Sequence, residues 1–473
     1  EHVSAISGND TMLADGDMLL ESWYDKQHGS IEFTSNLWKN GSLLCKHSNF
    51  LLNEDVFDVP ENKKCHRLIK NGLKGCVFDL LKKHIGQHPK WGALTGIRPV
   101  KMIHEMRADG LDDIMIRKQL FEVYKVHPEK ADLLMQTANV QRPLLDNGEN
   151  KEVSVYIHIP FCSTRCLYCS FPSDLIHRVS DKMNDYLRCL KREMTVVMEA
   201  LLSKGIIADT IYIGGGTPTV LNHSHLEPLL EFVKEQVTDI FPIREYTVEA
   251  GRPDSLDIKK LELMKEFGVT RLSINPQSMN QETLDLIGRN HTVEDVKRIT
   301  HQAREAGFDC INMDVILALP GETPEHMEHT MEQIAELKPE NVTVHTLAMK
   351  RASIWMDSFE QYDSARKGLA EQMAKVCKKW IEKMGMVPYY LYRQKYMLDH
   401  LENVGYALPG KECLYNIQFM DEKRDIWAFG AGASSKIYYP SEDRVERIGN
   451  VKDLNTYLSR IDEMIEKKLK VIS

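Results

Sequence analysis

The sequence predicts an α/β protein built on a partial (β/α)6 barrel of the TIM type, and three observations support this prediction. Downstream of residue 145, short apolar segments alternate six times with amphipathic helical segments. The apolar segments are nearly continuous, as in parallel strands that are covered on both faces. Polar residues cluster at the ends of these segments, where (β/α) barrels build their chemistry. The pattern alone also allows a doubly wound sheet, but the polar residues favour the barrel.

The expected strands occupy residues 153–159, 210–214, 245–250, 271–276, 310–317 and 341–347. Apolar residues at helical spacing predict intervening helices at about 181–203, 223–236, 257–267, 280–287, 293–306 and 324–337. Helical segments thus separate consecutive strands, as the crossovers of a parallel sheet require.

Three parts are expected along the chain. Residues 1–145 read as an N-terminal α+β accessory domain, with a strand-rich start and helices at 62–85, 112–124 and 127–139. Within this part, WGALTGIRPVK reads as a loop because its Gly and Pro interrupt the helical pattern. Residues 146–350 form the barrel core. Residues 351–473 form a C-terminal α+β extension that is expected to cover the substrate.

Composition limits the classes of function. The 473 residues carry a net charge of −9, which argues against binding to nucleic acid. No apolar run reaches the roughly 18 to 20 residues that span a membrane, and no signal-peptide pattern opens the chain. The ten cysteines are scattered apart from one cluster, so a reducing, cytoplasmic location is expected.

The cluster lies in HIPFCSTRCLYCSF (158–171), where Cys162, Cys166 and Cys169 form a C-x3-C-x2-C array after the first strand. Structural zinc usually has four protein ligands, and no second C-x2-C follows. A redox dithiol would leave Cys162 unused, and three buried apolar thiols are improbable among polar neighbours. An iron–sulfur cluster on three thiolates uses the whole array and leaves one iron open to a bound molecule.

Glycines follow the second strand in the sequence GGGTP (214–218). Residues without Cβ let the backbone approach a ligand closely. A phosphate-binding P-loop is excluded because no Lys-Ser/Thr follows the glycines. Four further polar residues lie at or near the ends of later strands: Glu249, Gln277, Asp314 and His345. Together these residues predict one site at the C-terminal edge of the sheet.

The cysteine array, with Tyr168 before its last member, resembles the signature of the radical S-adenosylmethionine (SAM) superfamily. The resemblance implies a 4Fe-4S cluster on Cys162, Cys166 and Cys169, whose unique iron chelates SAM. It also implies an electron donor such as flavodoxin or ferredoxin. One electron would cleave SAM, and the resulting 5′-deoxyadenosyl radical would abstract a hydrogen from the substrate.

A closer resemblance is to the oxygen-independent coproporphyrinogen III dehydrogenase (oxidase) family of porphyrin and heme biosynthesis. It is carried by YIHIPFC, GGGTPT, RLSINPQS, GRNHT and DVILALPGET. WGALTGIRPVK, YYLYRQKY, CLYNIQFMDEK and FGAGASSK are similar to the HemZ type of this family. The resemblance implies an anaerobic oxidoreductase that decarboxylates coproporphyrinogen III propionates to vinyl groups, giving protoporphyrinogen IX.

The resemblance assigns SAM-binding roles to nine residues: Tyr156, Tyr168, Gly215, Gly216, Thr217, Glu249, Gln277, Arg289 and Asp314. The two tyrosines would lie near the methionine and adenine moieties, and the glycines and threonine would line the amino group. The last four would bind the ribose and the carboxylate. A barrel-rim ion pair with Arg271 or Arg289 is the alternative for Glu249 and Asp314.

Arg252, Arg393 and Lys395 are the candidate cations for the substrate carboxylates. The last two lie in YYLYRQKY, whose tyrosines and cations suit an apolar ring with a carboxylate rim. The alternative is a strand with its aromatics packed inward and its cations solvated.

Two departures from the family pattern bear on function. Phe171 stands where the better-understood enzyme of the family has a further cysteine, so the number of SAM molecules, one or two, stays open. The related haem chaperones share this phenylalanine, but they have a His-Asn pair where this chain has Tyr415-Asn416. A haem-trafficking protein and a radical SAM haem-processing enzyme therefore remain alternatives, and the oligomeric state stays open.

Overall fold

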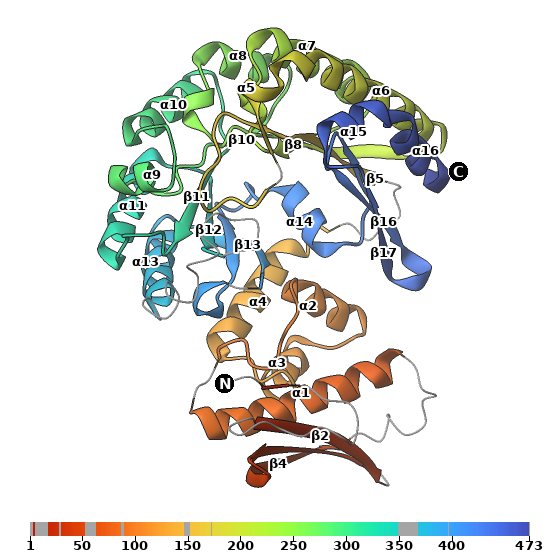
Figure 1. The fold of residues 1–473 in the computed structure, drawn as a ribbon, viewed down its shortest axis with the longest axis vertical. Helices are drawn as coiled ribbons and strands as arrows, with labels where there is room; N and C mark the ends of the chain where they lie inside the picture. The colour runs from red at the N-terminus through yellow and green to blue at the C-terminus, as the bar shows by residue number, and fades with distance from the viewer. Residues whose placement is uncertain are drawn as a thin grey trace. The chain divides into compact units, whose positions relative to one another are not determined.

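The computed structural model describes residues 3–4, 18–27, 30–52, 63–86, 89–145, 152–171, 173–348, 368–395 and 397–472. The chain forms two compact units, Glu1–Met135 and Gln136–Ser473 (Figure 1). The boundaries expected at 145/146 and 350/351 stay predictions. Strands from both sides of residue 350 belong to one sheet in the second unit.

The first unit combines a sheet with helices. Strands β2 (Met18–Gln27), β3 (Ser30–Lys39) and β4 (Ser42–Leu52) pair antiparallel, and β1 (Val3–Ser4) joins β2 in parallel. Helix α1 (Lys63–Ile85) packs on this sheet through Ile31, Phe33 and Cys76. Three helices follow: α2 (Pro99–Ala108), α3 (Asp113–Glu122) and α4 (Pro128–Gln141).

Helix α2 was not predicted. Pro99, which the sequence analysis took as an interruption, is the first residue of this helix. Proline is favourable there because its fixed φ suits the first turn and its missing N–H would have no helical partner. A proline after a glycine-rich stretch can therefore begin a helix as well as end one.

The second unit is built on an eleven-stranded sheet with the order β13-β14-β12-β11-β10-β9-β8-β5-β15-β16-β17. Its centre consists of six strands: β5 (Glu152–Ile159), β8 (Ile207–Gly215), β9 (Glu245–Glu249), β10 (Arg271–Ser273), β11 (Ile311–Leu317) and β12 (Asn341–Thr346). These six are parallel neighbours in chain order. The six predicted parallel strands and the helices between them are confirmed, and the sheet is open, as a partial barrel requires.

The C-terminal residues extend this sheet at both ends. Strand β14 (Asn403–Ala407) pairs antiparallel with β12, and β13 (Val387–Tyr392) pairs with β14. At the other end, β15 (Ile426–Phe429) joins β5 in parallel, and the hairpin of β16 (Ser434–Tyr439) and β17 (Arg444–Gly449) follows. Much of the C-terminal part is thus continuous with the core sheet.

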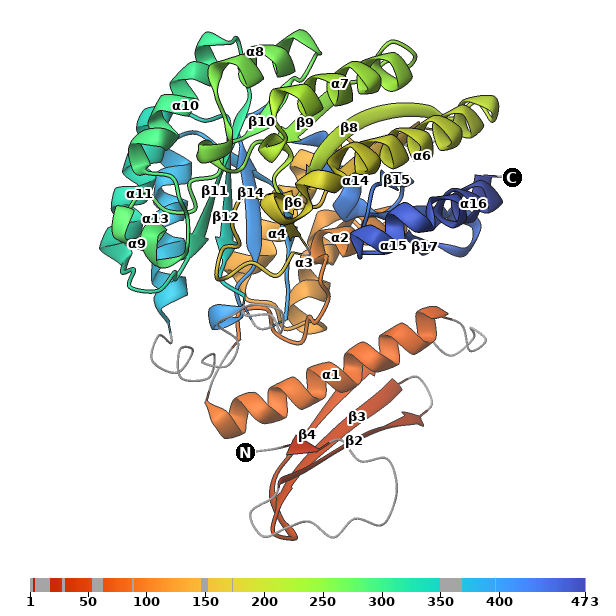
Figure 2. The ribbon, with the colours of Figure 1, turned by 45° about the horizontal axis from the view of Figure 1, so that its top comes forward.

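Helices line the outer side of the curved sheet in Figures 1 and 2. They are α6 (Met183–Ser203), α7 (His223–Val233), α8 (Ile258–Glu266), α9 (Gln281–Leu286), α10 (Val293–Glu305), α11 (Pro324–Leu337) and α13 (Leu369–Lys383). Helix α14 (Leu414–Asp421) lies on the opposite side of the sheet in Figure 1. Among the described helices, none is long and apolar enough to cross a membrane.

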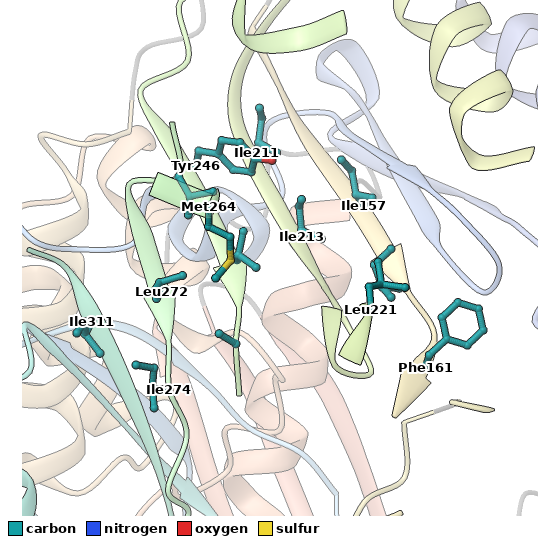
Figure 3. Packing of buried hydrophobic residues seen from close by; sticks show 14 of the residues in the cluster. Ile157, Phe161, Ile211, Ile213, Leu221, Tyr246, Met264, Leu272, Ile274 and Ile311 are labelled. Carbon is teal, nitrogen blue, oxygen red and sulfur yellow. The ribbon is translucent and has the colours of Figure 1, made fainter. Parts of the chain in front are cut away.

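Side chains alternate between the two faces of the central strands. Figure 3 shows apolar residues from adjacent strands, among them Ile157, Ile213, Tyr246 and Leu272, in one buried layer with Met264 of α8. The residues between them face the other way. We call that side the inner face, and its members include Tyr156, Tyr212, Glu249, Asp314 and His345. Glu249, Asp314 and His345, which the sequence analysis singled out, therefore share one face.

A buried ion pair joins the C-terminal helix α16 (Ile461–Ile472) to α6. Glu193 and Lys468 are both fully buried and hydrogen-bonded to each other. Glu193 also accepts hydrogen bonds from the Gly430 amide at 2.9 Å, Asn450 at 2.8 Å and Tyr457 at 2.7 Å. The pair thus holds the turn after β15, which lies against the end of β5.

Candidate active site

The three cysteines lie on one loop after β5, which we call the cysteine loop (residues 162–169). Cys162 ends the short strand β6 (Phe161–Cys162), and the Cys169 amide donates to the Cys166 carbonyl at 3.1 Å. All three side chains are half-buried. Burial raises the pKa of Cys169, and the neighbouring Cys166 and Cys162 also raise it. A thiolate here therefore needs a nearby positive charge.

Tyr168 and Arg289, both assigned to SAM from the sequence, are in contact. The Arg289 Nη2 donates to the Tyr168 hydroxyl at 3.2 Å, and its Nη1 donates to the Gly251 carbonyl at 2.9 Å. Arg289 is buried, and within the described part of the chain its Nε has no hydrogen-bond partner. One charged donor of this pair is therefore available to a ligand.

The structure places Arg252 against the cysteine loop. This side chain is only 4% exposed. Its Nε lies 3.2 Å from Asp254 Oδ1, and its Nη1 donates to the Thr164 carbonyl at 3.1 Å and to Cys166 Sγ at 3.7 Å. A guanidinium that is engaged by a carboxylate and by the cysteine loop is not presented to a substrate. Substrate binding by Arg252 stays a prediction, and it would require these contacts to break.

The glycines after β8 pack tightly against the segment that leads to the cysteine loop. Gly215 has a φ of +116°, and a Cβ there would lie 2.2 Å from His158 Cδ2. A Cβ on Gly216 would lie 2.5 Å from the Phe161 carbonyl oxygen. Thr217 donates to Cys162 Sγ at 3.5 Å. The glycines thus permit a close approach within the protein itself, and their contact with SAM stays a prediction.

Glu249 ends β9 on the inner face. Its carboxylate accepts hydrogen bonds from the Tyr212 hydroxyl at 2.7 Å and from the Gly215 amide at 3.1 Å. Burial raises its pKa to about 7, and Asp314 also raises it. The alternative, an ion pair between Glu249 and Arg271, is not observed. Arg271 instead pairs with Glu245, with its Nε 3.4 Å from Glu245 Oε2.

Asp314 lies on the inner face of β11 beside His345 of β12. Its Oδ1 accepts from Asn312 at 2.7 Å, and its Oδ2 lies 3.5 Å from His345 Nε2. Burial alone would raise the pKa of Asp314, but hydrogen bonds from His345, Asn312 and Thr343 hold it below its usual value. The sequence analysis placed His345 at this edge of the sheet but gave it no binding role. The other ring nitrogen of His345 lies 3.5 Å from the Tyr392 hydroxyl, which links β13 to this site.

Gln277 follows β10 in an unusual backbone conformation. Its φ is +68°, which side chains other than glycine rarely adopt. The conformation is held because its amide donates to the Asp314 carbonyl at 2.9 Å and its carbonyl accepts from the Ile316 amide at 3.0 Å. Its Oε1 is buried without a hydrogen-bond partner in the described structure. A polar atom in this state is a candidate ligand contact.

Three tyrosines stack on the inner face. Tyr212 and Tyr415 have ring centroids 4.5 Å apart, and each lies 6.1 Å from Tyr156. Tyr415 comes from α14, so this helix contributes to the floor of the site. The sequence analysis missed Tyr212, although its alternation with Ile211 and Ile213 indicates that it faces the opposite side from them.

The tyrosines and cations of 389–396 have mixed environments. Tyr389 and Tyr390 are buried in a core cluster, as the packing alternative predicts. Arg393 is half-buried, and burial lowers its pKa, whereas the charge of Glu402 raises it. Lys395 is exposed. Tyr396 lies outside the described residues. Binding of substrate by Arg393 and Lys395 stays a prediction.

Comparison with known proteins identifies the family. Residues 156–334 match the radical SAM superfamily. The chain is 39% identical to the oxygen-independent coproporphyrinogen-III oxidase-like protein HemZ of Bacillus subtilis, over 88% of this chain and 83% of that protein. It is 32% identical to the heme chaperone HemW of the same organism, over 63% of this chain and 74% of that protein.

The chain belongs to the HemZ-type family of radical SAM enzymes.

Among solved structures, the coproporphyrinogen III oxidase HemN of Escherichia coli, a radical SAM enzyme, shares the fold. The TM-score is 0.52 at 23% identity, over 69% of this chain and 73% of that chain. The predicted α/β fold class is therefore confirmed. The sequence-based assignment to the family is confirmed as well.

The radical SAM cofactors are a 4Fe-4S cluster and SAM, and the residues present fit both. Among the described residues, no three His, Cys, Asp or Glu side chains surround one point that a single metal ion could fill. A 4Fe-4S cluster does not need three ligands around one point, because each thiolate binds a different iron atom. Three half-buried thiols on one loop are therefore suitable ligands for it. Gln277 Oε1 and Arg289 Nε, which lack a hydrogen-bond partner among the described residues, are an acceptor and a donor of the kinds that SAM needs.

Proposed function

We propose that this radical SAM enzyme acts in tetrapyrrole metabolism and decarboxylates propionate side chains of coproporphyrinogen III oxidatively, giving the vinyl groups of protoporphyrinogen IX. The observation that carries the proposal is the convergence of two sets of residues on the inner face. One set holds the cofactor candidates Glu249 and Asp314, and the other holds the aromatic floor that includes Tyr415.

The chain's own residues would bind and orient the reactants. Gln277, Arg289, Glu249 and Asp314 would hold SAM by hydrogen bonds at the ends of the strands. When bound, the cluster and SAM would supply the radical that removes a hydrogen from the propionate, and loss of CO2 together with one electron, passed to an acceptor, would complete the vinyl group. The stacked tyrosines would cover one side of the apolar tetrapyrrole ring and exclude water. Arg393 would fix a propionate, because reaction requires the side chain to be held at contact distance.

The likeness to heme chaperones makes haem binding the second candidate. In this chain, haem would have to be ligated by Tyr415, which takes the place of the histidine of those relatives. Tyr415 is 5% exposed and stacked on Tyr212. Burial raises the pKa of Tyr415, and Tyr156 and Glu249 raise it further, which opposes formation of a phenolate ligand. These observations support the enzyme over the haem carrier.

Turnover should separate the two candidates. Anaerobic reaction of reconstituted wild-type protein with SAM, a reductant and coproporphyrinogen III should give vinyl-bearing product by mass spectrometry. Arg393→Ala should lower this turnover roughly ten- to a hundredfold, because a charged hydrogen bond contributes about 1.5 to 3 kcal/mol. Uncoupled cleavage of SAM to 5′-deoxyadenosine should stay near the wild-type rate, since Arg393 acts on the substrate alone.

Arg447→Ala is a suitable control, because Arg447 is exposed on β17. It should leave both activities unchanged. If wild-type protein gives no vinyl-bearing product but binds haem tightly, and Tyr415→Phe abolishes that binding, the haem carrier is the better description.

Binding of SAM should depend on pH through Glu249. Its pKa is raised to about 7, so its ionised form is lost as the pH falls through 7. If that form accepts hydrogen bonds from SAM, affinity should fall by up to about tenfold per pH unit below 7. Glu249→Gln should bind SAM more weakly at pH 8 and lack this decline. The dissociation constant of SAM, measured between about pH 6 and 8, gives both the affinity and its pH dependence. If the affinities of wild type and Glu249→Gln change with pH in parallel, Glu249 does not bind SAM.

A further inference from the structure

We propose that Arg252 is a positioning residue for the cluster: it donates an N–H to the Cys166 thiolate and thereby raises the reduction potential of the cluster that Cys166 holds. The inference rests on the cluster assignment, and it goes beyond the proposed chemistry on coproporphyrinogen. It gives Arg252 a role that differs from the substrate binding expected from the sequence.

The guanidinium contacts the cysteine loop twice through one nitrogen. Arg252 Nη1 lies 3.1 Å from the Thr164 carbonyl oxygen and 3.7 Å from Cys166 Sγ. The first contact fixes the backbone between Cys162 and Cys166. The second is within the range of an N–H···S hydrogen bond, which is longer than a bond to oxygen because sulfur is larger. Arg252 thus helps to fix the conformation of the cysteine loop and also stabilises negative charge on Cys166.

A carboxylate orients the guanidinium. Asp254 faces the other edge of Arg252, with Oδ1 3.2 Å from Nε and Oδ2 3.4 Å from Nη2. Asp254 also accepts from the Ser163 hydroxyl at 3.4 Å, and His291 Nδ1 lies 3.9 Å from it. This bidentate contact engages Nε and Nη2, so Nη1 points toward the cysteine loop. The arrangement is preorganised, since a planar guanidinium held at one edge has little freedom at the other.

The effect on potential follows from charge. Reduction adds an electron to the cluster, and part of the added charge resides on its sulfur ligands. A donor to a ligand sulfur stabilises the reduced state more than the oxidised state, and so raises the potential. The effect is large when the donor is buried, and Arg252 is 4% exposed. A higher potential eases electron delivery to a cluster that has to cleave SAM.

The test is a redox titration of anaerobically reconstituted full-length protein without substrate, followed by the EPR signal of the reduced cluster. Arg252→Met keeps the length of the side chain but removes its charge and donors. At a fixed applied potential, we expect the ratio of reduced to oxidised cluster to fall about tenfold in this variant. For a one-electron couple, this equals a reduction potential about 59 mV lower. Arg252→Lys keeps a charged donor and should recover part of this loss.

Lys260→Met provides a matched control. Lys260 is a buried cation in the same region, and its ammonium donates to the Thr219 and Ser255 carbonyls, at 2.7 and 2.9 Å. Loss of its charge should leave the potential unchanged. A second readout is SAM cleavage, which Arg252→Met should lose with a weak electron donor and retain with a stronger reductant.

The outcomes distinguish this inference from the proposed function. A wild-type potential in Arg252→Met with full iron content overturns the inference, whatever the enzyme does with coproporphyrinogen. An equal fall in Lys260→Met overturns it as well, because the effect would then be general. If Arg252→Met cannot hold iron, Arg252→Gln, which removes the charge but keeps a polar side chain, takes its place. A potential of Arg252→Lys between those of wild type and Arg252→Gln then supports the inference, and a wild-type potential in both variants overturns it.

Discussion

Replacing any one of Cys162, Cys166 or Cys169 with alanine should abolish the iron–sulfur cluster. Wild-type protein reconstituted without oxygen should bind about four irons per chain and show a broad visible absorption that dithionite bleaches. Each alanine variant should lose this absorption and all cleavage of SAM. The effect is all-or-none because the loop supplies only three thiolates, so the loss of one leaves a second iron without a protein ligand.

The other cysteines provide controls. Cys76 and Cys377 are buried, and burial is the main cause that raises the pKa of each thiol. Cys45 lies in the first unit, as does Cys65, whose side chain is outside the described residues. Alanine at any of these four positions should leave the iron content unchanged. Stoichiometric zinc with no iron in wild-type protein, after anaerobic handling, would refute the cluster assignment.

The central sheet could be predicted from the sequence because the pattern that indicates it lies within short segments of the chain. Each of β5, β8, β9, β10, β11 and β12 is a short apolar segment followed by an amphipathic helix, and a parallel sheet then follows from the connectivity. The site could be predicted for the same reason. Residues such as Glu249 and Asp314 mark the ends of strands, and the ends of parallel strands meet at one edge.

What the sequence could not predict depends on contacts between distant segments. Strand β15 pairs with β5, more than 260 residues earlier in the chain, and nothing local to residues 426–429 indicates this partner. Arg252 was assigned to the substrate because it is a cation near a strand end. Its partners Asp254, Thr164 and Cys166 come from two loops whose approach the pattern does not specify.

The ion pair of Glu193 and Lys468 is a further example. Both residues lie on amphipathic helices, α6 and α16, where a charged residue normally reads as part of the solvated face. In the structure both are fully buried. The periodicity of each helix alone cannot reveal that the partner charge is 275 positions away.

Breaking this ion pair should destabilise the second unit severely. In Lys468→Met, the Glu193 carboxylate would remain buried without its cation, and such a loss typically costs about 3 to 5 kcal/mol. The Lys468 ammonium also donates to the Ala428 carbonyl at 2.5 Å, so β15 would lose a contact as well. We expect a lower midpoint for unfolding of the full-length chain in denaturant. Lys379→Met, which removes an exposed partner of Glu328, should leave that midpoint unchanged.

A double variant tests whether charge or packing is responsible. Glu193→Gln alone should also be strongly destabilising, because it leaves the Lys468 ammonium buried without a counter-charge. Combining Glu193→Gln with Lys468→Met removes both charges. The Gln amide oxygen can still accept from the Gly430 amide and Tyr457, which Glu193 now satisfies. The double variant should therefore be more stable than either single variant. Replacing both members of a buried ion pair changes the free energy of unfolding little, whereas leaving one buried charge without its partner lowers it strongly. Losses that simply add in the double variant would show that packing around α6 and α16, and not the charge pair, carries the stability.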